Sequence, residues 1–307
     1  MNMKKQILCL ALPLLLGGLA GCSKGTKVEN LEEKKAIVND VAEGAAKNIG
    51  KSDLTFNLNL KVDGEATLPE GKVKFDSFAL EAEGEFDFPE TLEKGSDIKN
   101  IKAHLGLETA GKITVTQGSV ETKAECNCKF ADFYLDEGII YGDIYKNGFS
   151  DFLNSALSLG QELPLKSKLD FGSLIDPNSI IDMQKDFESP DIPDELLNQV
   201  AIYVAGDKFT FELDTREATF KDDAGVEHSV KDFYGVDLNA SLVVDKEFHL
   251  KEVEAKGNLD VSKLDEKKQA SGNLAVNLQA KVNRKDNPTV PTVSDKDAYK
   301  EFKLFGK

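Results

Sequence analysis

The feature that most constrains the fold is an alternation of apolar and polar residues with a period of two. Between residues 54 and 62 every even-numbered residue is apolar, and every odd-numbered one up to residue 61 carries a hydroxyl, amide or ammonium group. Since successive side chains of a strand point to opposite sides of a sheet, this pattern predicts a strand with one apolar and one polar face. The pattern returns at residues 78–88, 101–107, 113–115, 131–135, 209–213, 236–244, 253–261 and 274–282.

About ten such strands joined by short turns indicate an antiparallel sheet with one face in water and the other covered. The segments FNLNLKV at 56–62 and VNLQAKV at 276–282 are alike, which suggests that they are neighbouring strands. The sequence leaves open whether the strands before and after residue 150 form one sheet or two.

Two regions replace this alternation with helical spacing. Residues 30–49 repeat apolar positions every three or four residues, and Asn30 with Glu33 has the arrangement of a capping box. A helical insert is predicted over 149–200, with short helices at 150–160, 176–187 and 192–200. We therefore predict an α+β, mostly β fold: one domain over 30–285, with a curved antiparallel half-barrel sheet of about ten strands covered by a few helices.

The N-terminus has the layout of a secretory signal. Lys4 and Lys5 precede an apolar run at 7–16 and small residues at 17–21, and the run is about half of the roughly 20 residues that cross a bilayer. Leu19-Ala20-Gly21-Cys22 has the form of a bacterial lipobox, so we expect cleavage before Cys22 and acylation of its thiol. The alternative is an ordinary secretory signal with an incidental cysteine.

An acylated Cys22 would anchor the chain stably on a membrane without crossing it, because two or three acyl chains exceed the two-signal requirement. The expected organisation is a signal peptide at 1–21, a tether at 22–29 and a C-terminal tail at 286–307. The expected location is the cell membrane, with the domain facing outside the bacterial cytoplasm.

Charge excludes one class of partner. The chain has 38 basic and 54 acidic residues, a formal charge of −16, and loss of Lys4 and Lys5 with the signal would make it −18. Nucleic acid is excluded as a partner because its phosphates would be repelled. The sequence identifies no protein partner.

No catalytic or metal-binding motif is present. The chain lacks His-Glu-x-x-His, Gly-x-Ser-x-Gly and a phosphate-binding glycine loop. His104, His228 and His249 have no Cys, Asp or Glu at ligand spacing, so we expect no enzyme activity, no cofactor and no metal site. Cys126 and Cys128 would share one face of a strand. They would be two inert half-buried thiols, a strained disulfide bridge, or part of a metal site whose other ligands come from elsewhere in the chain.

One stretch resembles a known family. KFADFYLDEGIIYGDIYKNGFSDFL at 129–153 reads as a strand, a turn at Gly138, a second strand ending in tyrosines and a helix. It resembles the central hairpin of the LolA-like carriers and the related lipoproteins of the LppX and LprG type, and FGSLIDPNSIIDMQ at 171–184 resembles the helix start that follows. The resemblance implies a half-barrel whose helices enclose an apolar cavity for acyl chains or a glycolipid.

The expected function is therefore a non-catalytic lipid or hydrophobic-ligand carrier or chaperone. The alternative is a surface interaction or adhesion lipoprotein with a fully packed core and no ligand cavity, and a cavity of several hundred Å³ would distinguish the two. The candidate ligand-facing residues are the apolar positions of the strands, Phe56, Leu58, Leu60, Phe78, Leu80, Phe209, Phe211, Leu238 and Leu242.

Overall fold

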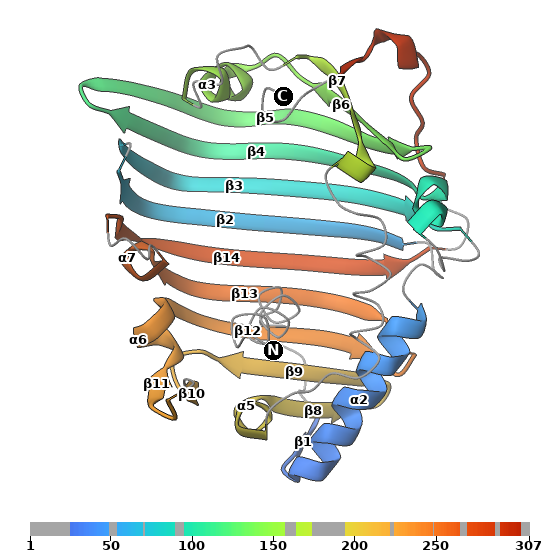
Figure 1. Ribbon diagram of the computed structural model, residues 1–307, viewed down its shortest axis with the longest axis vertical. Coiled ribbons are helices and arrows are strands. Elements are labelled where there is room, and N and C mark those ends of the chain that lie inside the picture. Colours follow the sequence, from blue (N-terminus) through green and yellow to red (C-terminus); the bar gives the residue numbers. More distant parts are fainter. Residues whose placement is uncertain are drawn as a thin grey trace.

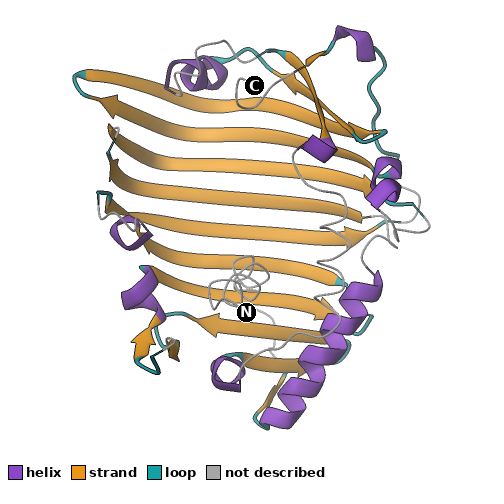
Figure 2. Ribbon diagram, in the orientation of Figure 1, coloured by secondary structure: helices purple, strands orange, loops and turns teal. Residues whose placement is uncertain are grey.

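A single large curved sheet dominates the computed structural model of the protein (Figures 1 and 2). The structure describes residues 25–48, 54–69, 71–89, 95–156, 164–173, 194–221, 224–247, 249–264, 269–285 and 289–301. Within these residues the sheet has 13 strands in the order β1-β8-β9-β12-β13-β14-β2-β3-β4-β5-β6-β7-β15, and its two end strands do not pair with each other. Every neighbouring pair is antiparallel except β7 and β15. The predicted mostly β fold with a curved antiparallel sheet is confirmed.

The strands of this sheet are β1 (Thr26–Val28), β2 (Leu54–Leu68), β3 (Gly71–Asp87), β4 (Lys102–Gln117), β5 (Val120–Asp136), β6 (Ile139–Ile144), β7 (Lys166–Asp170), β8 (Ala201–Ala205), β9 (Lys208–Asp214), β12 (Val236–Asp245), β13 (Leu250–Asp260), β14 (Ser271–Arg284) and β15 (Lys300–Glu301). A separate hairpin consists of β10 (Thr219–Lys221) and β11 (Glu227–Ser229). The helices are α2 (Leu31–Asn48), α3 (Gly148–Ala156), α5 (Asp194–Gln199), α6 (Val230–Tyr234) and α7 (Val261–Leu264), with 3₁₀ turns η1 (Gly95–Asn100), η2 (Phe171–Ser173) and η3 (Lys296–Ala298).

The strands before and after residue 150 form one sheet, because β14 pairs with β2. The two similar segments noted in the sequence lie side by side in register, with Val276 opposite Val62 and Val282 opposite Phe56. Their likeness therefore reflects shared surroundings at the middle of the sheet.

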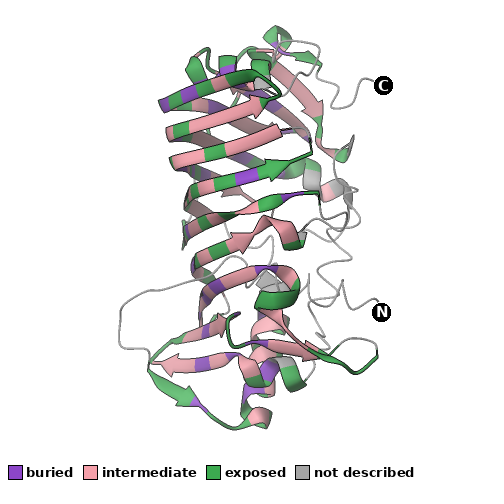
Figure 3. Ribbon diagram, turned by 90° about the vertical axis from the view of Figure 1, so that its left-hand side faces the viewer, coloured by how far each residue is buried: buried purple, intermediate pink, exposed green. Residues whose placement is uncertain are grey.

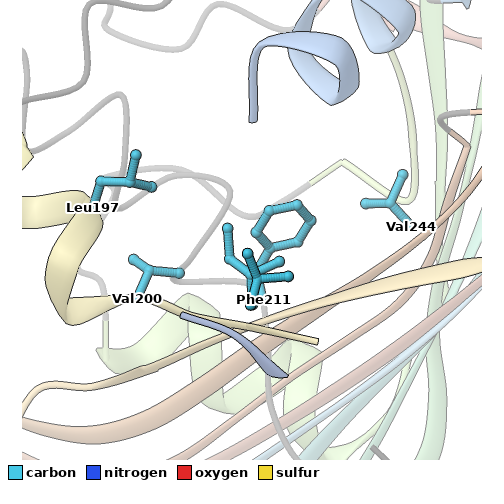
Figure 4. Packing of buried hydrophobic residues seen from close by; sticks show 6 residues of the cluster. Leu197, Val200, Phe211 and Val244 are labelled. Carbon is cyan, nitrogen blue, oxygen red and sulfur yellow. The ribbon is translucent and has the colours of Figure 1, made fainter. Parts of the chain in front are cut away.

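The apolar face of the sheet carries a cluster of buried side chains near each end. The cluster at the α2 end consists of Val28, Leu197, Val200, Ile202, Phe211 and Val244. Figure 4 shows the Phe211 ring between Leu197 and Val200 on one side and Val244 on the other. The cluster at the α3 end consists of Phe78, Ala124, Cys126, Phe149 and Phe152. Burial alternates along many strands, as the period-two pattern predicts (Figure 3).

The helices are held at these ends by polar contacts as well as apolar ones. Asn30 caps α2, its side-chain oxygen accepting from the amides of Glu32 at 2.8 Å and Glu33 at 3.2 Å. Lys34 is buried and donates to the carbonyls of Leu197 and Val200, at 3.3 and 2.6 Å, where α5 ends. The amine thus satisfies carbonyls that a helix end leaves without partners.

The predicted helical insert at 149–200 is only partly helical. Helices α3 and α5 lie where the sequence predicts helices at 150–160 and 192–200, whereas the predicted helix at 176–187 lies outside the described residues. Residues 166–170 instead form β7, which pairs with β6 and satisfies backbone groups along its free edge.

Both predicted terminal segments are shorter than expected. Residues 26–28 of the predicted tether form β1, pair with β8 and bury Val28. In the predicted tail, Tyr299 is buried against Tyr141, with ring centroids 5.2 Å apart, and residues 300–301 pair with β7. Apolar burial and backbone pairing hold these segments on the sheet.

Candidate functional site: the apolar face of the sheet

The strand register places the predicted ligand-facing residues on one side of the sheet. Residues directly opposite each other on neighbouring strands share a face. One row crosses the sheet through Phe211, Leu242, Val253, Ala280, Leu58, Ala82, Leu107 and Ala131. Leu60 lies opposite Leu80, and Val62 lies opposite Phe78.

The candidates differ in how far the chain itself covers them. Phe78, Phe211 and Leu238 are buried, with 9%, 6% and 5% of their surface exposed. Phe209 and Leu242 pack against the α2-end cluster, and Leu80 packs against the α3-end cluster. The remaining three, Phe56, Leu58 and Leu60, are half-buried and belong to neither cluster.

These three residues are part of a larger half-buried apolar surface, which we call the mid-sheet stripe. Its members come from β14, β2 and β4 and are Phe56, Leu58, Leu60, Val62, Leu105, Leu107, Val276 and Val282. In the row that contains Leu58 and Leu107, these two leucines are flanked by small residues on the neighbouring strands, Ala280, Ala82 and Ala131. Packed helices commonly interlock with such a surface, as can the methylenes of a ligand.

Two aromatic rings lie flat against this face. A Cβ atom at Gly84 would come within 2.0 Å of the Phe56 ring, and one at Gly142 within 3.1 Å of the Phe133 ring. Each ring therefore leans over a glycine of the neighbouring strand and does not stand upright from the sheet. Because the two glycines have no side chain, the rings can lie close to the backbone and project less from the sheet at these places.

The two cysteines lie on the same face, next to the α3-end cluster. Both are free thiols: Cys126 is buried, and Cys128 is half-buried with its Sγ atom 3.7 Å from Thr109 Oγ1. Burial raises the pKa of the Cys126 thiol. The bridge is thus not formed, and among the described residues no three His, Cys, Asp or Glu side chains are grouped to hold a metal.

The polar face contains a network that the sequence analysis missed. Asp132 is buried and accepts from Tyr145 Oη at 2.6 Å, Lys129 Nζ at 2.7 Å and His104 Nε2 at 3.0 Å. The ring of Tyr134 stacks on His104. His104 and Asp132 are 28 residues apart, and only the alternation could have indicated that they share a face.

Hydrogen bonding sets the protonation state of this network. Burial alone would raise the pKa of Asp132, but the bonds from Lys129, Tyr145 and His104 outweigh burial and hold this pKa below its usual range. The same carboxylate raises the pKa of Tyr145 to about 12. Asp132 is thus ionised, and it fixes Tyr145 just before α3.

The predicted lipid-attachment residue, Cys22, lies outside the described residues. No helix in the described part of the chain is long and apolar enough to cross a membrane.

Comparisons with known proteins find little. No protein-family model and no curated protein matches the chain. Among solved structures, the chain is similar to the crystal structure of LprF from Mycobacterium bovis, at 12% sequence identity and a TM-score of 0.25, over 84% of this chain and 97% of that one. Function is therefore inferred from the residues of the chain itself.

Proposed function

We propose that this chain is a lipid-anchored, extracytoplasmic lipoprotein that binds a lipid or another hydrophobic ligand on the apolar face of its sheet, without catalysis. The observation that carries the proposal is the mid-sheet stripe. It lies between two ends whose apolar residues pack under described helices, and its own residues remain half-buried, although Leu278 of β14, opposite Leu60, is buried.

The chemistry of the stripe suits an acyl chain. Leu, Val and Phe side chains line it, and each buried methylene of a ligand would contribute about 0.8 kcal/mol. The flat rings of Phe56 and Phe133 leave the surface low, which favours an elongated apolar occupant over a bulky one. Such binding depends on shape and apolar contact and needs no metal or cofactor.

The membrane location follows from the lipobox at residues 19–22. Acylation of Cys22 would hold the domain at the outer surface of the membrane, where lipids are both ligand and surroundings. A chain whose formal charge is −18 after loss of Lys4 and Lys5 with the signal would otherwise have little attraction for an anionic lipid surface.

The first experiment asks whether a ligand is present. The Cys22→Ser chain without its signal would be purified, extracted with organic solvent and measured by native mass spectrometry, so that covalent lipid cannot confuse the result. We expect a co-purifying lipid in near-stoichiometric amount, or uptake of a fluorescent fatty acid. An apo mass with no uptake would contradict the proposal and leave a surface interaction module with a packed core.

A matched pair of variants then locates the ligand. Leu58→Gln places an amide in the middle of the stripe, whereas Leu68→Gln makes the same change at the exposed tip of the same strand. An amide buried against an acyl chain costs about 1–3 kcal/mol, so Leu58→Gln should weaken fatty-acid binding about 5- to 150-fold. Leu68→Gln should bind as the parent chain does, and equal weakening in both variants would place the ligand elsewhere.

A further inference from the structure

A cluster of four aromatic rings, of which Phe233 is exposed and the other three are half-buried, lies at one corner of the molecule, away from the mid-sheet stripe. Its members are Phe220 of β10, His228 of β11, and Phe233 and Tyr234 of α6. Phe220 meets the other three at centroid distances of 5.1 to 5.4 Å, and Phe233 lies 4.9 Å from His228 and 4.8 Å from Tyr234. We call this cluster the aromatic corner.

The corner presents apolar surface to its surroundings. Phe233 is 48% exposed, and Val226, in the segment joining β10 and β11, is 52% exposed. Exposed apolar groups that gather at one place commonly mark contact with a protein or a membrane. Aromatic rings with a polar edge or hydroxyl, such as those of His228 and Tyr234, favour the boundary between water and lipid.

The corner is fixed firmly to the α2 end of the sheet. Gln199 of α5 holds Thr219 of β10 through two hydrogen bonds, its Nε2 donating to the Thr219 carbonyl at 2.6 Å and its Oε1 accepting from the amide at 2.5 Å. Helix α5 leads directly into β8, which pairs with β1. Figure 1 shows β1, α5 and the β10–β11 hairpin together at the lower end of the sheet.

That end must lie near the membrane if Cys22 is acylated. Because β1 begins at Thr26, only four residue steps separate the anchor from the sheet, which limits the span to about 14 Å. A tether of that length keeps the α2 end, and the corner attached to it, close to the bilayer. The α3 end lies at the opposite side of the strand order.

We propose that the aromatic corner inserts into the interfacial region of the lipid bilayer to which the chain is anchored and so orients the sheet on the membrane. This inference rests on the anchoring part of the proposed function. The contact with lipid must come from apolar surface and not from charge attraction, because acidic residues outnumber basic ones around the corner. Residues 221–232 contain two lysines, Lys221 and Lys231, and four acids, Asp222, Asp223, Glu227 and Asp232. The occupant is therefore the zwitterionic phospholipid surface, and anionic lipid should not strengthen the contact.

The absence of tryptophan from the sequence permits a direct test. A chain beginning at Cys22, with Cys126→Ala and Cys128→Ala to leave one thiol, would be coupled through Cys22 to a maleimide lipid in phosphatidylcholine vesicles. Phe233→Trp then provides a single indole at the corner. Brominated acyl chains should quench its emission to about half, because interfacial groups reach about 5–10 Å into the headgroup and acyl boundary.

Val120→Trp is the matched control. Val120 is 64% exposed and lies at the tip of the β4–β5 hairpin, near the α3 end of the sheet. Its indole should be quenched little in the same vesicles. Equal quenching of both indoles, or quenching of neither, would overturn the proposal.

Two further arms separate the remaining outcomes. If the Phe233→Trp indole is quenched only when the vesicles contain anionic phosphatidylglycerol, the contact is electrostatic and the proposal is overturned. If, without vesicles, the indole emission shifts to the blue as the protein concentration rises, the corner instead binds a second copy of the chain. Fatty-acid uptake by the untethered Phe233→Trp chain is measured separately. Loss of uptake with quenching retained would contradict the ligand proposal alone, and retained uptake without quenching would contradict the corner alone.

Discussion

The two ends of the apolar face and its middle arise from the same sequence pattern but differ in what covers them. At the α2 end, Ile202 has none of its surface exposed, and Phe211 is buried beside Leu197 of α5. In the middle, Leu58 lies in the same row of the sheet as Phe211 and is only half-buried. An alternating strand therefore determines which face a side chain takes, whereas its burial depends on elements elsewhere in the chain.

The largest expected effect contrasts these two places directly. Ile202→Ala removes packed atoms from a fully buried site and should lower the free energy of unfolding by about 4 kcal/mol, whereas Leu58→Ala should lower it by about 1 kcal/mol. Guanidinium denaturation of the two ligand-free variants measures both values. Similar losses would mean that the middle of the sheet is packed as tightly as its end.

The second prediction concerns whether the two ends are held independently. Asp132→Asn removes a buried charge that Tyr145, Lys129 and His104 share and should cost about 3 kcal/mol. Hydrogen exchange should then accelerate in α3 more than in α2. Tyr145→Phe should show the same pattern at about 1 kcal/mol, and equal acceleration in both helices would show that the ends unfold together.

A smaller effect, dependent on pH, is expected from the polar face of the middle strands. Burial, and secondarily the neighbouring Glu252, raises the pKa of Glu254 to about 6, despite Lys281 and a hydrogen bond from Gln279. An acid whose pKa is raised by folding destabilises the folded chain above that pKa, and the penalty disappears as pH falls through 6 toward the unfolded value.

Glu254→Gln should therefore stabilise the chain by about 1–2 kcal/mol at pH 8 and by little at pH 4.5. Urea denaturation at the two pH values measures the difference. Glu125→Gln on β5 is the control, because 77% of its side chain is exposed and it is not among the groups that shift the pKa of Glu254. A stabilisation that is the same at both pH values would contradict the assignment to Glu254 ionisation.

The smallest expected effect on stability tests whether the flat position of the Phe56 ring over Gly84 leaves room for a ligand. Gly84→Ala displaces the Phe56 ring from its place over the neighbouring strand, at a cost of about 1 kcal/mol. The ring must then rise above the sheet and should weaken fatty-acid binding several-fold. Gly148→Ala is the control, since a Cβ there has no atom nearer than 4.0 Å, and unchanged binding in Gly84→Ala would separate Phe56 from the ligand.

Much of the fold could be predicted because period-two alternation is a property of the strand itself. It correctly indicated the long strands, the face that Leu58 takes and the pairing of residues 56–62 with 276–282. It could not indicate β1 or β7, because segments of three and five residues are too short to show a period and are held by pairing with an existing edge.

The sequence predicts which face of the sheet carries the candidate site, but it does not predict which residues of that face are left uncovered by helices. Phe78 and Leu60 look alike in sequence, and only the position of α3 makes Phe78 part of a core. The Asp132 network depends on strand register: a shift between Leu107 and Glu108 leaves one extra residue on β5, and without it the alternation would place Lys129 and Asp132 on opposite faces. The aromatic corner likewise requires the hairpin to bring Phe220 onto α6.

The pairing of β14 with β2 also has a consequence for how the molecule is made. Leu54 and Arg284 face each other across this seam although 230 residues separate them, so the loop that must close is almost the whole domain. Because the chain is synthesised from its N-terminus, β2 to β6 are made long before β14, the strand that pairs with β2. Until β14 is made, the unpaired backbone groups along the edge of β2 can pair with another chain and cause aggregation. Strand β14 thus both completes the mid-sheet stripe and covers the exposed edge of β2. A chain truncated before residue 271 would lack a complete stripe and would keep that edge unpaired.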